Sequence, residues 1–174
     1  MENLKKNKIF AIVFIAMMAA FYVILNRFLS LSVGNIVRIG FSFVAVAMGA
    51  RFFGVIGGVA VGALGDIIGA ILFPSGPYFP GYTLTAAVMG LIYGLALYKL
   101  GAPSVVKAVC AVVPSQIICT LLLNTLWTSI LYTKAFIPVL TSRLVQSAIM
   151  LPVQIIILVV LEKVLFPRIE KMLK

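Results

Sequence analysis

The chain has 174 residues, of which 63% are hydrophobic and only 10% are charged, and its mean hydropathy is +1.21. A soluble domain of this size needs a more highly charged surface, so the composition excludes an ordinary soluble protein and predicts one that lies in a lipid bilayer. In a soluble protein the net charge of +10 would suggest a nucleic-acid partner. In a membrane protein it reflects basic loops on one side, so we expect no nucleic-acid partner.

Apolar stretches of membrane-spanning length recur along the whole chain, and no polar stretch is long enough to form a separate soluble domain. We therefore predict a single transmembrane domain over residues 1–174, an all-α integral membrane protein built as a compact bundle of six transmembrane helices. The predicted spans are 8–30, 36–52, 54–73, 83–100, 104–132 and 138–166. The second span is short, and only the corner at Arg51-Phe52-Phe53-Gly54 separates it from the third.

The distribution of Lys and Arg predicts the orientation of these spans, because basic residues concentrate in cytoplasmic loops. With the N-terminus inside, ten of the fourteen basic residues fall on the cytoplasmic side, and only Arg27, Arg38, Lys134 and Arg143 fall on the outer side. Six spans return the chain to the side on which it started. Both termini are therefore predicted to be cytoplasmic.

The third predicted span carries small residues at helical spacing. Gly54, Gly58 and Gly62 follow one another at intervals of four, and Asp66 continues the same row. A row of glycines lets a neighbouring helix approach to backbone contact, so we interpret these residues as a packing surface.

The connection between the third and fourth predicted spans, Phe73-Pro74-Ser75-Gly76-Pro77-Tyr78-Phe79-Pro80-Gly81-Tyr82, contains three prolines and two glycines. These residues interrupt a helix, and the four aromatics make the segment more apolar than an ordinary exposed loop. Two interpretations stay open. The segment is either an aromatic belt at the membrane interface or a lid over an outward-facing pocket.

Polar residues form a stripe on each of the last two predicted spans. Gln116, Thr120 and Asn124 lie at intervals of four in the fifth span, and the sixth has a stripe that contains Arg143, Gln146, Ser147, Met150 and Gln154. Amide side chains are costly to expose to lipid, so both stripes should face the interior of the bundle. There they either hydrogen-bond one helix to another or line a polar cavity open to the outside.

The outer side of the predicted bundle carries groups suited to an aromatic anion. Arg38 and Arg143 are candidates for binding carboxylates, whereas Arg27, at the end of the first span, is expected to reach the headgroups. Four aromatic residues are candidates for holding a flat ring, namely Trp127, Tyr78, Phe79 and Tyr82.

The sequence contains none of the residue groups that are typical of an enzyme active site. There is no histidine, no carboxylate pair, no cysteine–histidine cluster and no phosphate-binding G-x-x-x-x-G-K-[ST] motif. We therefore expect no metal, no cofactor and no ATP hydrolysis by this chain itself.

Several segments resemble the substrate-binding S components of energy-coupling factor (ECF) vitamin transporters, which have six short spans in fewer than about 200 residues. The first span contains Ala16-Met17-Met18-Ala19-Ala20, which gives the A-x-x-x-A spacing of that family. The folate branch is resembled by four further segments: Gly65-Asp66-Ile67-Ile68-Gly69-Ala70 with the proline-rich connection after it, Val37-Arg38-Ile39-Gly40-Phe41, and Thr141-Ser142-Arg143-Leu144. The similarity extends over essentially the whole chain.

The resemblance implies a multi-pass protein of the bacterial cell membrane that binds folate from outside and delivers it inward with an ECF T component and two ABC ATPases. Ala16 and Ala20 would dock onto the T component. On chemistry and membrane depth, we expect the folate site to contain Arg38, Arg143, Trp127, Asn124, Gln146, Tyr78, Phe79 and Tyr82. Three alternatives stay open: an S component for another vitamin, a non-transporting assembly subunit, and a proton-coupled carrier that uses Asp66.

Overall fold

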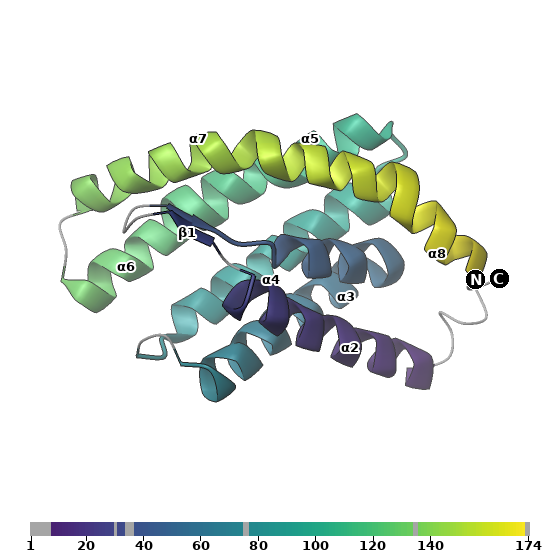
Figure 1. The fold of residues 1–174 in the computed structure, drawn as a ribbon, viewed down its shortest axis with the longest axis horizontal. Helices are drawn as coiled ribbons and strands as arrows, with labels where there is room; N and C mark the ends of the chain where they lie inside the picture. The colour runs from purple at the N-terminus through teal and green to yellow at the C-terminus, as the bar shows by residue number, and fades with distance from the viewer. Residues whose placement is uncertain (1–7, 30, 34–36, 75–76, 134–135, 173–174) are drawn as a thin grey trace.

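The structure is a computed structural model, and it describes residues 8–29, 31–33, 37–74, 77–133 and 136–172. Helices account for nearly all of the regular structure, with one small antiparallel hairpin (Figure 1). In chain order the elements are α2 (Lys8–Arg27), β1 (Leu31–Val33), β2 (Val37–Ile39), α3 (Phe43–Leu72), α4 (Pro80–Gly94), η1 (Leu95–Lys99), α5 (Ser104–Ser115), η2 (Gln116–Leu123), α6 (Asn124–Tyr132), α7 (Phe136–Val160), η3 (Leu161–Leu165) and α8 (Phe166–Met172), where η denotes a π-helix.

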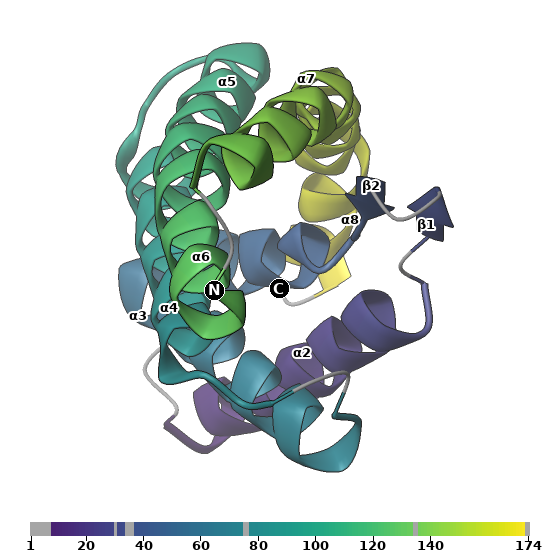
Figure 2. The same ribbon diagram turned by 90° about the vertical axis from the view of Figure 1, so that its left-hand side faces the viewer.

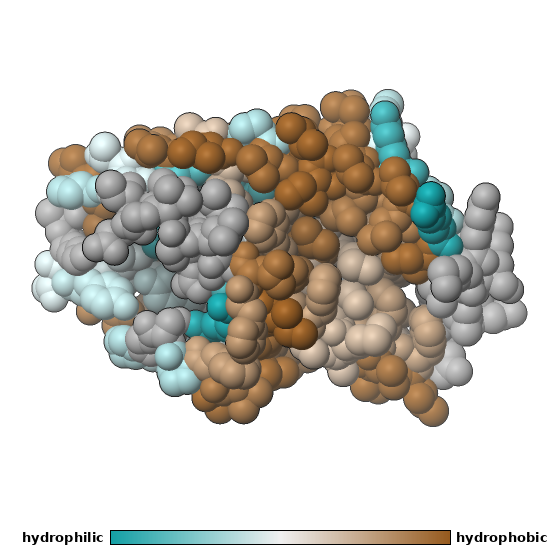
Figure 3. All heavy atoms as spheres, in the orientation of Figure 1, coloured by the Kyte–Doolittle hydropathy of each residue, from teal (hydrophilic) through white to brown (hydrophobic). Residues whose placement is uncertain are grey.

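Among the described residues, five helices are long and apolar enough to cross a membrane. They are Lys8–Arg27, Phe43–Leu72, Pro80–Tyr98, Ser104–Tyr132 and Phe136–Ile169. Hydrophobic residues cover the middle of the face drawn in Figure 3, whereas most hydrophilic residues lie toward its two ends. This pattern is the one expected of a surface that faces hydrocarbon in its middle and water or headgroups at both ends. The predicted helical membrane protein is therefore confirmed.

The predicted second and third spans lie together in α3, which is sharply bent at Gly54. This glycine has φ +67° and ψ −151°, a backbone conformation that residues with a Cβ rarely adopt. A Cβ on Gly49 would meet the Val61 side chain at 2.7 Å. In a straight helix those two residues would be about 18 Å apart, so the parts of α3 before and after Gly54 fold back against each other.

The prediction that a helix begins at residue 36 is wrong. The first helical residue of this part of the chain is Phe43, and Val37–Ile39 instead forms β2, which pairs antiparallel with Leu31–Val33. The hairpin packs through β2 against α7. The part of α3 before Gly54 is therefore about 16 Å long, roughly half the thickness of the hydrocarbon core.

The glycine row of α3 packs against α4, as its spacing predicted. A Cβ on Gly58 would collide with the carbonyl oxygen of Gly90, and a Cβ on Gly62 would collide with that of Ala86. Further along the row, Gly65 lies against the ring of Tyr22 in α2. The absence of side chains on this row thus allows two helix backbones to touch.

Aromatic rings join the beginning of α2 and the beginning of α8 to the bend in α3. Phe10 lies 6.4 Å from Phe53, Phe14 lies 5.5 Å from Phe52, and Phe52 lies 5.9 Å from Phe166, measured between ring centroids. In Figure 1 this end of the molecule is on the right, whereas α6 and the beginning of α7 are on the left. Figure 2, viewed from that left-hand side, shows α2, α4, α6 and α7 around a common centre.

Candidate functional site

A cavity of about 780 Å³ opens between the helices at the end opposite α8. Its walls come from the last turns of α2, the second half of α3, the beginning of α4, the η2–α6 segment and α7 as far as Gln154. Its volume lies within the range typical of sites for small molecules. Six of the eight residues that the sequence proposed for ligand binding line it, namely Tyr78, Phe79, Tyr82, Asn124, Arg143 and Gln146.

The polar stripes predicted in the last two spans face each other across this cavity. Gln116, Thr120, Asn124 and Thr128 contribute one wall, and Arg143, Gln146, Met150 and Gln154 contribute the other. Both alternatives considered for these stripes are therefore met. The stripes line a cavity, and at its inner end they also hydrogen-bond one helix to another, since Gln116 Nε2 donates to Gln154 Oε1 at 2.8 Å.

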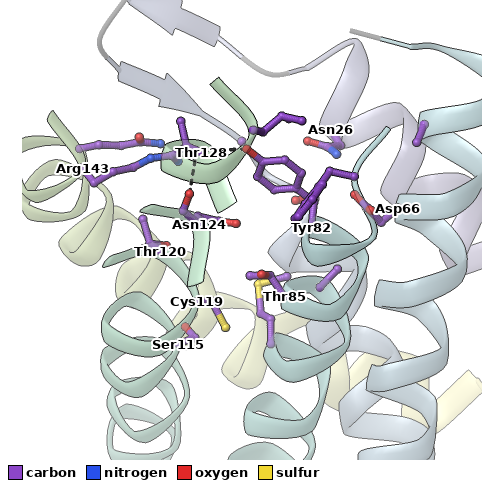
Figure 4. Close-up of a pocket in the computed structure, with 18 of the residues that line it drawn as sticks. Asn26, Asp66, Tyr82, Thr85, Ser115, Cys119, Thr120, Asn124, Thr128 and Arg143 are labelled. Carbon is purple, nitrogen blue, oxygen red and sulfur yellow. Dashed lines mark hydrogen bonds between the residues drawn. The ribbon is translucent and has the colours of Figure 1, made fainter. Parts of the chain in front are cut away.

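Thr128 connects three helices near the mouth of the cavity (Figure 4). Its hydroxyl donates to the carbonyl oxygen of Asn124 at 2.7 Å, so its oxygen acts as the acceptor for its other two partners. These partners are the Tyr82 hydroxyl at 3.1 Å and Nη2 of Arg143 at 3.2 Å. One threonine oxygen thus holds both the first turn of α4 and the guanidinium of α7.

Arg143 is a partly buried cation for which the described part of the chain provides no carboxylate partner. Its hydrogen bond to Thr128 uses one of the five donors of a guanidinium. A cation that has left bulk water without a counter-ion is costly, so an anion in the cavity would stabilise it. Arg143 is therefore the natural place for an anionic ligand group.

Arg27 has a different environment on the opposite wall. It was expected to reach the headgroups, but it lines the cavity, and its charge acts on the carboxylate of Asp66. That carboxylate also accepts a hydrogen bond of 2.8 Å from Thr83, whose oxygen accepts in turn from the Tyr78 hydroxyl at 3.1 Å. Arg27 thus has a carboxylate close enough to interact with its charge, whereas Arg143 has none among the described residues.

Trp127 supports the wall of the cavity from behind and is not one of the residues that line it. Its ring lies 5.6 Å from that of Phe79, and its indole Nε1 donates to Thr85 Oγ1 at 3.0 Å. Gly81 fits between these rings, since a Cβ there would meet both of them at 2.5–2.6 Å. The aromatic side chains that face the cavity are therefore Tyr78, Phe79 and Tyr82, together with Tyr22 and Tyr132.

The inner end of the cavity is closed by tightly packed apolar side chains. One helical turn beyond Gln116 and Gln154 lie Val112 and Leu158, both 0% exposed, and Leu97 is buried to the same extent. The polar cavity therefore ends at the two amides, and packed core begins beneath them.

The remaining predicted residues lie apart from the described cavity. Ala16 and Ala20 lie on an exposed face of α2, beside the exposed Met17. Arg38 belongs to β2, and its side chain falls outside the described part of the structure. Residues that sequence reasoning did not assign to the site include Tyr22, Asn26, Arg27, Asp66, Ser115 and Ser142.

The fold and the site define a multi-pass membrane protein with a polar cavity of small-molecule size between its helices. The family model of the ECF transporter substrate-specific component matches residues 10–162. The chain therefore belongs to the family of substrate-specific components of ECF transporters, which are transport proteins of the cell membrane rather than enzymes.

Relatives and solved structures agree with this assignment. The chain is 38% identical over 152 residues to a folate transporter FolT of Clostridium novyi (strain NT), covering 87% of each protein. It is 31% identical over 167 residues to a folate transporter FolT of Leuconostoc mesenteroides subsp. mesenteroides, covering 89% of each. It is also similar to a crystal structure of FolT bound with folic acid, with a TM-score of 0.78 and 28% identity over 86% of this chain and 90% of that one.

Proposed function

We propose that this protein captures folate at the outer face of the cell membrane and delivers it into the cell as the substrate-specific subunit of an ECF importer. The observation that carries the proposal is Arg143, a cation without a carboxylate partner among the described residues, in a cavity with several aromatic side chains. Folate combines a flat heteroaromatic ring with a glutamate tail. The similarity to two FolT proteins and to a folic acid complex supports folate over other vitamins.

In this proposal Arg143 binds a carboxylate of the glutamate, through charge-assisted hydrogen bonds. Tyr78, Phe79 and Tyr82 pack against the aromatic parts of the ligand, and Asn124 and Gln146 offer amide groups along the wall of the cavity. Trp127 acts through Phe79 and Thr85, which it holds in place. Arg38, from the hairpin beside α7, is proposed as a second cation for the tail.

We also propose that the 174 residues form one transmembrane domain of six segments with both termini in the cytoplasm. The bend at Gly54 divides α3 into a short segment and a longer one. The five long helices of the described residues therefore provide six segments. The contacts of Phe10 and Phe166 with Phe52 and Phe53 support the same side for both ends of the chain. Ten of the fourteen basic residues then lie on the cytoplasmic side.

Energy for import would come from partner subunits, since the sequence has no phosphate-binding loop. We propose an ECF T component and two ABC ATPases as these partners. Ala16 and Ala20 provide a small-residue patch on the exposed face of α2, and such a patch allows close approach of a helix from another subunit.

The proposal is tested by purifying the chain alone and measuring folate binding. Mass spectrometry of the extracted ligand should identify folate or a derivative of it. Trp127 is the only tryptophan and packs on a residue that lines the cavity, so added folate should quench its fluorescence by energy transfer to the pterin. Recovery of a different vitamin, or a protein that ignores added folate by calorimetry as well as by fluorescence, would contradict the proposal.

Replacing Ala16 and Ala20 together by leucine should prevent co-purification with the T component while leaving folate affinity unchanged. The larger side chains would hold the partner helix away from α2, and neither alanine lines the cavity. Pull-down with a tagged T component measures the first effect, and calorimetry measures the second. Ala148→Leu, at an exposed position of α7, is the matched control. Equal loss of co-purification in the control would refute the assignment of the docking face.

A further inference from the structure

The inner end of the cavity contains a chain of three buried polar side chains that has a defined direction. Ser147 is 7% exposed, Gln116 is 5% exposed and Gln154 is 8% exposed. Ser147 Oγ donates to Gln116 Oε1 at 3.3 Å, and Gln116 Nε2 donates to Gln154 Oε1 at 2.8 Å. In this series of hydrogen bonds, Ser147 donates to the amide of Gln116, and Gln116 donates to the amide of Gln154.

This direction determines which group of Gln154 remains for a ligand. Its carbonyl oxygen is occupied by Gln116, whereas its NH₂ group donates to no described residue. Gln154 is also one of the residues that line the cavity. This NH₂ group is accessible from the cavity, so it can donate to a ligand that places an acceptor there.

The inner end suits a neutral ring better than a charged tail. Gln116, Gln154, Ser115, Cys119 and Met150, which line it, carry no charge, and burying a carboxylate among neutral groups is far more costly than burying a hydrogen-bonded ring. Arg143 lies eleven residues before Gln154 on the same helix, about 16 Å away along its axis. An elongated ligand that pairs its carboxylate with Arg143 therefore extends its other end toward Gln154.

Building on the proposed function, we infer that the Gln154 NH₂ group donates to the 4-oxo group of the pterin ring, and that this contact selects folate against its 4-amino analogues. A 4-amino group presents hydrogens where folate presents an oxygen. Two donors would then face each other, because the oxygen of Gln154 already accepts the hydrogen bond from Gln116. Gln116 and Ser147 are positioning residues for this selection.

The inference is tested by calorimetry with folate and with aminopterin, which replaces the 4-oxo group by an amino group and keeps the glutamate tail. Wild-type protein should bind folate about tenfold more tightly or better. Gln154→Met should bring the ratio of the two dissociation constants close to one. Ser147→Ala should lower the ratio as well, because Gln116 and then Gln154 become free to rotate.

Two matched variants on the same helix separate selection from general damage. Arg143→Gln should weaken both ligands by the same factor and leave their ratio unchanged. Thr141→Val, at an exposed position outside the cavity, should change neither affinity. Equal affinity of the wild-type protein for both ligands would overturn the inference and leave folate capture intact, as would a ratio that Gln154→Met leaves unchanged. A wild-type protein that binds neither ligand would overturn the proposed function, and this inference with it.

Discussion

Replacing Arg143 by glutamine is expected to weaken folate binding by about 1.5–3 kcal/mol, roughly ten- to 150-fold, because a hydrogen bond to a charged group is lost. Glutamine keeps the length and polarity needed to reach Thr128, so the connection to α4 and α6 has a substitute donor. What disappears is the positive charge. The dissociation constant measured by calorimetry gives the size of this effect.

The control for this prediction is a change in the ligand. The dimethyl ester of folate has no tail charge, so its affinity should respond little to Arg143→Gln. If Arg143 pairs with the tail, wild-type protein prefers folate to the ester and the variant loses that preference. An equal loss for both compounds would show that the substitution disturbs the cavity in general. No loss for either would show that Arg143 does not bind the glutamate tail.

Replacing Gly90 by valine is expected to destabilise the protein by about 1–3 kcal/mol or more, because overpacking forces well-packed groups apart. A Cβ at this position would collide with the carbonyl oxygen of Gly58 and approach the nitrogen of Val59 at 2.6 Å. Both are backbone atoms of a neighbouring helix, so no side-chain rotation relieves the collision. Thermal unfolding in detergent measures the effect.

Gly101→Ala is the matched control, because a Cβ on Gly101 would have no atom within 4 Å and its residue is exposed. Its unfolding temperature should equal that of the wild type, whereas that of Gly90→Val should fall clearly below it. Similar unfolding temperatures for the two variants would contradict the close contact between α3 and α4. Folate added at saturation should raise both temperatures, since it binds only the folded protein.

Hydropathy predicted the membrane helices well. It failed at a short segment whose composition suits a strand as well as a helix. Val37–Ile39 is as apolar as a helix end, but it pairs with Leu31–Val33 as a strand. A short apolar run does not distinguish strand from helix without knowledge of its partner. The corner at Arg51-Phe52-Phe53-Gly54 indicated the bend in α3. That the two parts of α3 fold back against each other could not be predicted, because it depends on tertiary contacts such as that of Gly49 with Val61.

The polar stripes predicted the cavity because residues four apart share one face of a helix. Asn124, Arg143 and Gln146 all line it for that reason. Trp127 packs behind the wall because it lies about 100° around the helix from Thr128, which lines the cavity. Arg27 was assigned to the headgroups because it ends an apolar span, and only the tertiary structure places it beside Asp66.

The packed base of the cavity limits how a solute can cross the membrane. Below Gln154 the interior is filled by side chains such as Leu158 and Val112, and beside the cavity the backbones of α3 and α4 touch at Gly58 and Gly90. The described helices therefore form a blind well rather than a pore. A solute can leave through the closed end only if the helices separate or the whole subunit turns over, so the helix contacts that stabilise the fold also prevent the solute from leaking through it.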